Sequence, residues 1–149
     1  MKILSCFSNE TKKFAGLLAK KILSRPYEKK LALVIGLSGD LGAGKTTFIQ
    51  GFCRSIGIRK RITSPTFVLF KRFKVNNPRF ANLYHIDCYR LKKPEELLKL
   101  GFKEILNNPQ NIVLIEWAEK IKKILPKKII RISFEYGKKE NERNITKYE

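Results

Sequence analysis

The stretch LALVIGLSGDLGAGKTTFIQGFCRSIG, residues 31–57, decides the fold. Its first seven residues form a continuous apolar run with the length of a strand that is buried on both faces. A glycine-rich segment follows and fits the pattern G-x-x-x-x-G-K-[ST], with Gly39, Gly44, Lys45 and Thr46 at the fixed positions. We therefore expect a strand over residues 31–37, a loop, and a helix that Gly57 caps at its C-terminus.

This strand, loop and helix together suit the binding of phosphate. Glycines at positions 39, 42 and 44 let the backbone curl until its N–H groups point at one anion, and the helix directs the positive end of its dipole to the same place. Lys45 can then reach the β- and γ-phosphates of a nucleotide, and the Thr46 hydroxyl can ligate a magnesium ion. The predicted phosphate site comprises Gly39, Asp40, Leu41, Gly42, Ala43, Gly44, Lys45, Thr46 and Thr47.

Length and charge limit the class of protein. The chain has 149 residues, which fits one domain over residues 1–149, and its 43% hydrophobic content supports a packed core. Lys and Arg number 32 against 13 Asp and Glu, a formal net charge of +19. This charge favours a phosphate-bearing partner such as RNA, or it is a compositional bias, because the lysines are scattered through every segment. For the protein alone we expect weak, unselective RNA binding, and we expect no DNA partner.

The cysteines and the apolar segments indicate in which cellular compartment the protein is expected. Cys6, Cys53 and Cys88 lie far apart and never form a C-x-x-C pair, so they suit neither a disulfide framework nor a zinc site. We expect reduced, mostly packed thiols in a cytoplasmic protein. The apolar segment at residues 3–7 is too short for a signal-peptide core, and no run approaches the length of a membrane span.

The rest of the chain alternates between helical and strand patterns. It predicts one α/β domain, with helices covering a sheet whose central strands are parallel. One helix is expected from an N-cap at Ser8 to about Leu23, and another from Pro94 to a stop at Gly101. Further strands are expected at residues 67–72, 80–91, 112–115 and 129–134, with short edge strands at 2–7 and 144–146.

Two acidic residues stand where strands are expected to end. The apolar residues 112–115 lead into Glu116 and resemble a Walker B strand, whose end lies beside the phosphate loop in a doubly wound sheet. Asp87 ends another strand, with His85 on the same face. Glu116 is predicted to contact a metal directly or through water, and the alternative is an exposed strand-end carboxylate. Asp87 is predicted to position a water or the metal, and the alternative is an aspartate that begins a turn. His85 fits a hydrogen-bonded, partly buried residue, and Trp117 either stacks or gates at a nucleotide or covers the core.

These motifs together resemble the TsaE family, also called YjeE, the small bacterial ATPases of tRNA threonylcarbamoyladenosine synthesis. The matching stretches are GDLGAGKTTF (39–48), SPTF (64–67), HIDCYRL (85–91) and IEWAE (115–119), and PEELLKLGF (94–102) matches an acidic helix that ends in glycine. The similarity covers most of residues 8–135. Cys88 stands where leucine is expected, Ala118 where proline or serine is common, and the C-terminal region matches loosely through an arginine near Arg143.

The resemblance implies a compact P-loop ATPase with a P-loop NTPase-like fold, in which a mixed, mostly parallel central sheet is flanked by helices. It implies that Lys45 and the loop amides hold the ATP phosphates, that Thr46 and Glu116 belong to the Mg²⁺ site, and that Lys45 and Asp87 serve hydrolysis. Family members work with TsaB and TsaD proteins, which modify adenosine 37 of tRNAs that read codons beginning with A. Contact with tRNA is therefore expected through that complex, in the cytoplasm and without a membrane.

Some assignments near the loop stay open. The resemblance implies that the turn over residues 64–67, with Ser64 and Thr66, acts as a switch-like segment near the γ-phosphate. A small P-loop kinase would share the phosphate chemistry, and the basic residues 59–61 give thin support for the lid that a kinase needs. A module that senses ATP without hydrolysing it is disfavoured by Glu116 and Asp87.

Overall fold

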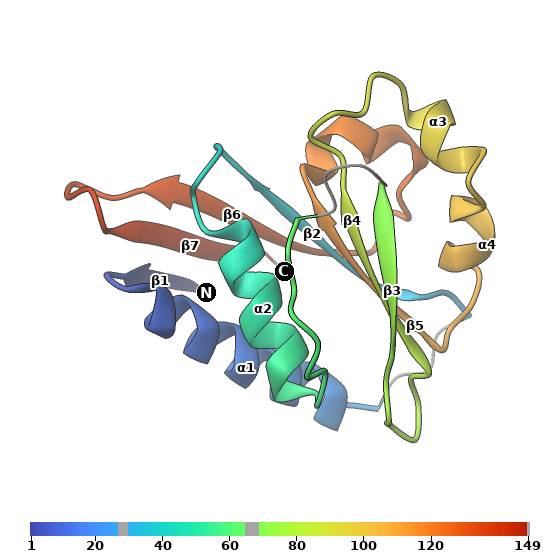
Figure 1. Cartoon of the computed structure of the whole chain (residues 1–149), viewed down its shortest axis with the longest axis horizontal. Helices are drawn as coiled ribbons and strands as arrows, with labels where there is room; N and C mark the ends of the chain where they lie inside the picture. The colour runs from blue at the N-terminus through green and yellow to red at the C-terminus, as the bar shows by residue number, and fades with distance from the viewer. Residues whose placement is uncertain (27–29, 65–68, 149) are drawn as a thin grey trace.

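The computed structural model describes residues 1–26, 30–64 and 69–148. These residues form a seven-stranded sheet in the order β1-β7-β6-β2-β5-β4-β3, with helices on both faces (Figure 1). The strands are β1 (Lys2–Ser5), β2 (Leu33–Gly39), β3 (Phe70–Lys74), β4 (Asn82–Asp87), β5 (Asn111–Glu116), β6 (Ile130–Tyr136) and β7 (Arg143–Tyr148). The helices are α1 (Ser8–Ser24), α2 (Lys45–Ser55), α3 (Pro94–Leu98), α4 (Phe102–Leu106) and the 3₁₀ helix η1 (Ala118–Ile124).

Parallel strands occupy the centre of the sheet. β2 pairs in parallel with β5 and β6, and β4 pairs in parallel with β5, whereas β1, β3 and β7 are joined antiparallel. β5 is buried along its whole length, because helices cover both faces of a parallel centre. The predicted α/β fold with a mixed, centrally parallel sheet is confirmed.

Each face of the sheet has its own apolar core. On one face, Leu33, Ile35 and Leu37 of β2 pack with residues of α1 and α2. On the other, Val34 packs with residues of α3, α4 and η1. This alternation follows from the two-residue period of a strand. The helices α1 and α2 approach closely, because a Cβ at Gly51 would lie 2.5 Å from the Cα of Lys12.

Two predicted helix boundaries are wrong. The helix α1 begins at Ser8, but its N-cap is Phe7, whose side chain cannot cap, and the Glu10 carboxylate instead accepts a 2.6 Å hydrogen bond from the Cys6 N–H. The helix that starts at Pro94 ends at Leu98, before the predicted stop. Gly101 has a left-handed φ of +86° and is the N-cap of α4, a short helix that the sequence did not predict.

The strands differ from prediction mainly at their ends. β2 begins two residues later than expected and continues to Gly39, and β5 extends through Glu116. The last strand, β7, is not at the edge, because it lies between β1 and β6; the predicted N-terminal edge strand is confirmed as β1. β4 ends at Asp87, so residues 88–91 are not strand. The expected strand at 67–72 is observed only from Phe70, and residues 65–68 lie outside the described part of the chain.

All three cysteines are free, and Cys53 and Cys88 are buried, which agrees with the prediction of mostly packed thiols. Burial raises the pKa of both buried thiols to about 12, so neither is a reactive thiolate at neutral pH. Among the described residues, none of the helices has the length and apolar character that a membrane crossing requires.

Candidate functional site

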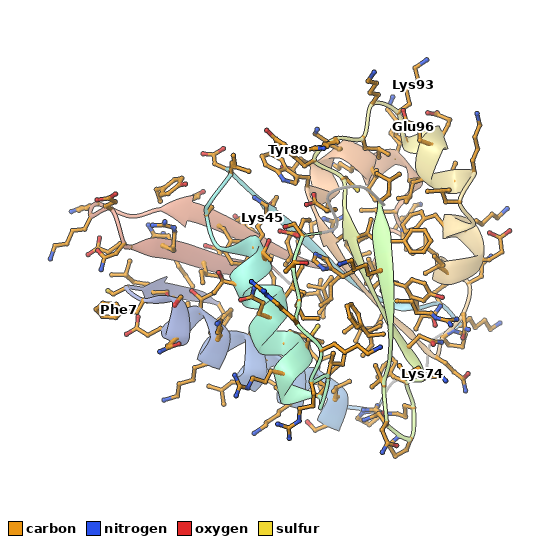
Figure 2. All side chains as sticks on the ribbon, in the orientation of Figure 1. Phe7, Lys45, Lys74, Tyr89, Lys93 and Glu96 are labelled. Carbon is orange, nitrogen blue, oxygen red and sulfur yellow. The ribbon has the colours of Figure 1, made fainter. Side chains whose placement is uncertain are left out.

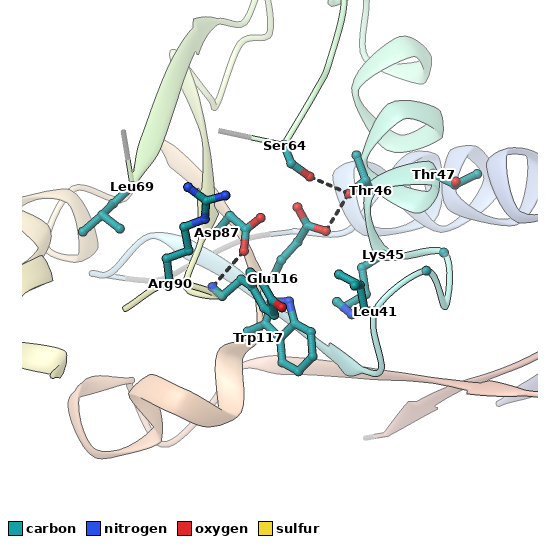
Figure 3. A pocket seen from close by; sticks show the side chains of 13 residues that line it. Leu41, Lys45, Thr46, Thr47, Ser64, Leu69, Asp87, Arg90, Glu116 and Trp117 are labelled. Atoms are coloured by element: carbon teal, nitrogen blue, oxygen red, sulfur yellow. Dashed lines mark hydrogen bonds between the residues drawn. The ribbon is translucent and has the colours of Figure 1, made fainter. Parts of the chain in front are cut away.

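A cleft of about 630 Å³ lies where β2, β4 and β5 end, beside the N-terminus of α2 (Figure 3). Parallel strands that end together place their loops and last side chains around one space, which is where α/β folds bind ligands. The residues that line the cleft are Leu41, Gly42, Gly44, Lys45, Thr46, Thr47, Ser64, Leu69, Asp87, Tyr89, Arg90, Glu116 and Trp117.

The glycine-rich loop joins β2 to α2 and has the predicted curl. Gly39, Gly42 and Gly44 have φ values of +138°, +74° and +105°. A Cβ at Gly39 would lie 2.3 Å from the carbonyl oxygen of Phe134 in β6, so a larger residue would push the loop off the sheet. Glycine is therefore needed in this loop for two reasons: it allows positive φ angles, and at Gly39 it allows the loop to lie close to β6.

Lys45 is the first residue of α2 and its side chain lies at the mouth of this loop (Figure 2). Its Nζ donates hydrogen bonds to the carbonyl oxygens of Gly39 at 2.5 Å and Asp40 at 2.8 Å, and it lies 4.2 Å from the centre of the Trp117 ring. Burial lowers the pKa of the Lys45 ammonium, while nearby carboxylates led by Glu116 oppose that shift. The lysine is thus held in the loop where the sequence predicts it.

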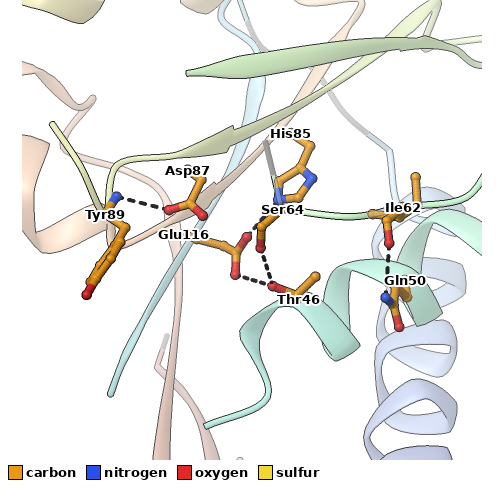
Figure 4. Close-up of polar contacts among 8 residues, drawn as sticks. All are labelled: Thr46, Gln50, Ile62, Ser64, His85, Asp87, Tyr89 and Glu116. Carbon is orange, nitrogen blue, oxygen red and sulfur yellow. Dashed lines mark hydrogen bonds and ion pairs between the residues drawn. The ribbon is translucent and has the colours of Figure 1, made fainter. Parts of the chain in front are cut away.

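A chain of hydrogen bonds links Thr46, Glu116 and His85 across the cleft floor (Figure 4). The Thr46 hydroxyl donates to Oε1 of Glu116 at 2.7 Å, and the other carboxylate oxygen lies 2.8 Å from Nε2 of His85. His85 is fully buried, and its Nδ1 has no hydrogen-bond partner within the described residues. A carboxylate only accepts, so Nε2 of His85 donates this hydrogen bond. His85 is the predicted hydrogen-bonded residue, and it orients Glu116.

Ser64 and Asp87 complete the polar part of the cleft (Figure 4). The Ser64 and Thr46 hydroxyl oxygens are 3.0 Å apart, so the start of the predicted 64–67 turn lies beside the phosphate loop. Thr66 is outside the described residues. Asp87 is opposite Glu116 in the β4–β5 register, and its carboxylate accepts a 2.9 Å hydrogen bond from the Tyr89 N–H. The pKa of Asp87 is raised, chiefly by burial.

Replacing Asp87 by asparagine should raise the thermal midpoint at neutral pH. A carboxyl whose pKa is raised on folding destabilises the protein once it ionises, so the penalty is present above the folded-state pKa and absent in acid, where both states hold the proton. Asparagine keeps the oxygen that accepts from Tyr89 and removes the charge. Thermal unfolding of both proteins at pH 7 and pH 4 checks this. The rise in thermal midpoint of Asp87→Asn over the wild type should be smaller at pH 4, and a rise of equal size at both pH values would exclude the charge as its cause.

Trp117 follows β5 in a strained conformation. Its φ of +59° is the one positive φ found at a described residue other than glycine. The indole lines the cleft, lies 5.3 Å from the Tyr89 ring, and packs partly against the second core. Both alternatives raised for Trp117, a position at the ligand site and a cover for the core, are thus compatible with its placement.

The oxygen donors of this cleft fit a magnesium ion. The described residues contain no group of three or more His, Cys, Asp or Glu that could cage a metal. Mg²⁺ does not need one, since it retains several waters and uses one or two protein oxygens with substrate phosphates. The Thr46 hydroxyl and the Glu116 carboxylate, 2.7 Å apart, are hard oxygen donors of this kind.

Some residues at the site were given no role on sequence grounds. Tyr89 and Arg90 line the cleft, although the sequence drew attention only to the motif that contains them. Tyr136 and Arg143 contact the phosphate loop from β6 and β7, through contacts between segments about a hundred residues apart. The two-residue alternation of β4 was the available signal for His85 and Asp87; no comparable signal marks Tyr136.

Comparisons with known proteins identify the family of this chain. The family model for "Threonylcarbamoyl adenosine biosynthesis protein TsaE" matches residues 7–145. The tRNA threonylcarbamoyladenosine biosynthesis protein TsaE of Rickettsia felis is 45% identical over 130 residues, 85% of this chain and 67% of that protein. The TsaE protein of Haemophilus influenzae is 38% identical over 125 residues, 84% of this chain and 73% of that one.

A solved crystal structure has a similar fold. The crystal structure of Bacillus subtilis YdiB superimposes with a TM-score of 0.75 at 33% sequence identity, covering 99% of this chain and 83% of YdiB. The B. subtilis protein named TsaE is 40% identical over 113 residues, 76% of this chain. The chain therefore belongs to the TsaE family of threonylcarbamoyl adenosine biosynthesis proteins.

Proposed function

We propose that the cleft binds ATP with Mg²⁺ and hydrolyses it in support of the threonylcarbamoyl modification of adenosine 37 in tRNAs that read codons beginning with A. The observation that carries this proposal is the convergence, on one cleft of about 630 Å³, of the phosphate loop, Thr46, Asp87 and Glu116. Membership of the TsaE family gives the biological context.

The phosphates would bind at the start of α2. The loop offers backbone N–H groups and a helix N-terminus, both of which favour an anion. Lys45 supplies a cation whose present partners are the carbonyl oxygens of Gly39 and Asp40. Phosphate oxygens carry full charge and would be stronger acceptors for this ammonium than neutral carbonyls.

Magnesium would be held by Thr46 and Glu116 together with the phosphates, and when bound it would neutralise charge that develops on the β- and γ-oxygens. The buried His85 N–H fixes the Glu116 carboxylate, so this carboxylate is held in place before any ligand arrives. Fixing a ligand through a second hydrogen bond is a general device of metal sites.

Asp87 is the group best placed to orient an attacking water. Its carboxylate lines the cleft beside Glu116 but belongs to a different strand, and the raised pKa makes it a stronger proton acceptor than an ordinary aspartate. Its hydrogen bond from the Tyr89 N–H fixes one carboxylate oxygen and leaves the other for a ligand.

The proposed partners are TsaB- and TsaD-type proteins of the cytoplasm, through which tRNA would be reached. Tyr89 and Leu41 at the rim of the cleft are 45% and 66% exposed. A partner docked across the rim would shield the site from water and order its loops. We therefore expect slow hydrolysis by the protein alone and faster hydrolysis with the partners.

Steady-state phosphate release at saturating ATP, measured with and without a TsaB–TsaD complex, tests this expectation. The rate should rise several-fold when the complex is added. A tRNA-free and a tRNA-containing reaction should be compared, because stimulation by tRNA alone would point to direct contact. Equal rates in a mixture whose assembly is verified by gel filtration would contradict the partner-coupled hydrolysis.

A further inference from the structure

Four consecutive carbonyl groups of the phosphate loop accept hydrogen bonds from two different sources. The carbonyls of Gly39 and Asp40 accept from Lys45, at the mouth of the loop. The next two accept from the β6–β7 hairpin: the Tyr136 hydroxyl donates to Leu41 O at 2.5 Å, and an Arg143 Nη donates to Gly42 O at 3.3 Å. Neither Tyr136 nor Arg143 is among the residues that line the cleft, so the hairpin contacts the loop from outside it.

The two hairpin donors are themselves held in place. Tyr136 and Arg143 are directly opposite each other in the β6–β7 register. The Arg143 guanidinium lies 4.3 Å from the centre of the Tyr136 ring, and its other Nη donates to the carbonyls of Glu140 at 2.6 Å and Glu142 at 2.8 Å. These contacts leave the guanidinium little freedom, so little entropy is lost when it also binds the loop.

Peptide geometry links these contacts to anion binding. In a trans peptide the C=O and the following N–H point in opposite directions. Fixing Leu41 O against the hairpin therefore directs the Gly42 N–H away from it. Gly42 has a left-handed φ of +74°, and a Cβ there would lie 3.0 Å from the Tyr136 hydroxyl. The tyrosine hydroxyl therefore lies beside Gly42, the residue whose N–H it directs away from the hairpin and toward the space where an anion would bind.

We propose that Tyr136 and Arg143 are positioning residues that hold the phosphate loop in its anion-binding conformation from outside the cleft. The proposal rests on the function proposed above, because it presumes that the loop binds nucleotide phosphates. It assigns a role to the β6–β7 hairpin, to which the sequence patterns gave none.

The test is calorimetric titration of Tyr136→Phe and Arg143→Ala with ADP and, separately, with inorganic pyrophosphate. Each variant should bind both ligands about 3- to 10-fold more weakly, the size expected for the loss of one hydrogen bond that supports a binding conformation. Tyr148→Phe is the matched control, since Tyr148 is an exposed tyrosine of the same hairpin whose hydroxyl pairs with Ser133. It should bind like the wild type.

A second readout separates positioning from a general loss of stability. The amide ¹⁵N–¹H resonance of Gly42 should shift in ligand-free Tyr136→Phe and stay in place in Tyr148→Phe, with thermal midpoints unchanged in both. Unchanged affinities in Tyr136→Phe and Arg143→Ala would overturn the proposal. Weaker binding of ADP with normal binding of pyrophosphate would also overturn it, because the residues would then serve the nucleoside. Wild-type protein that binds neither ligand would contradict the proposed function itself.

Discussion

Replacing Lys45 by methionine should weaken ATP binding by about 100-fold, the size expected for the loss of charge-assisted hydrogen bonds to phosphate. Lys45 Nζ lies inside the loop, and its side chain is nearly buried under Trp117. Methionine keeps an unbranched apolar stem under the indole, so the change removes the ammonium with little loss of packing. Calorimetry with ATP measures the affinity, and circular dichroism verifies the fold.

Lys120→Met is the matched control for this change. Lys120 is an exposed lysine whose Nζ lies 5.8 Å from the same Trp117 ring, and it donates its hydrogen bond to the Tyr89 carbonyl rather than to the phosphate loop. The Lys120→Met variant also loses one positive charge close to Trp117, and its affinity for ATP should change less than about threefold. Similar losses in both variants would mean that net charge, rather than the loop lysine, governs binding.

Replacing Glu116 by glutamine should lower the rate of ATP hydrolysis by about 10²- to 10³-fold, the effect typical of removing one group that stabilises transition-state charge. Glutamine has nearly the same shape and can still accept from Thr46, so the fold should survive. The affinity for ATP without magnesium should change little, whereas the gain in affinity on adding magnesium should be reduced. Phosphate release and paired titrations with and without Mg²⁺ measure these effects.

Glu119→Gln controls for the loss of one negative charge. Glu119 lies three residues further along the chain, is exposed, and acts on Lys45 only through its charge. Its hydrolysis rate and magnesium dependence should stay close to those of the wild type. If Glu116→Gln keeps the full magnesium response, Glu116 does not belong to the metal site.

The parts of the fold that follow from local patterns were predictable from the sequence. The apolar runs that become β2 and β5 are buried on both faces, and the glycines at 39, 42 and 44 have the left-handed backbone that the loop pattern requires. Strand order was less accessible. An edge strand was expected at residues 144–146, but β1 pairs with the outer side of β7. No local sequence pattern indicates that these two strands pair.

The helical region after β4 illustrates a second limit. Gly101 is a natural helix stop, and it was interpreted as one, yet the same left-handed φ also serves as the N-cap of α4. A glycine with a positive φ can either end the preceding helix or cap the start of the following one, so the glycine alone does not show which of the two it does. Packing of Phe102 and Ile105 into the second core decides it here.

For the site, the sequence predicted which residues meet but not how they are held. Thr46, Asp87 and Glu116 converge on the cleft, as the strand-end rule for parallel sheets requires. The buried bond from His85 to Glu116 and the hairpin contacts to the loop depend on register and on tertiary approach. Neither is encoded in a short motif, so the structure was needed to find them.

One measurement tests the central claim most directly. Phosphate release from Mg²⁺·ATP is compared between the wild type and Lys45→Met in the presence of a TsaB–TsaD complex, at an ATP concentration that saturates the wild type. The account predicts steady release by the wild-type protein and release reduced to the level of the complex alone in Lys45→Met. Equal release by the two proteins, or no release by a wild-type protein that binds ATP, would contradict hydrolysis in this cleft.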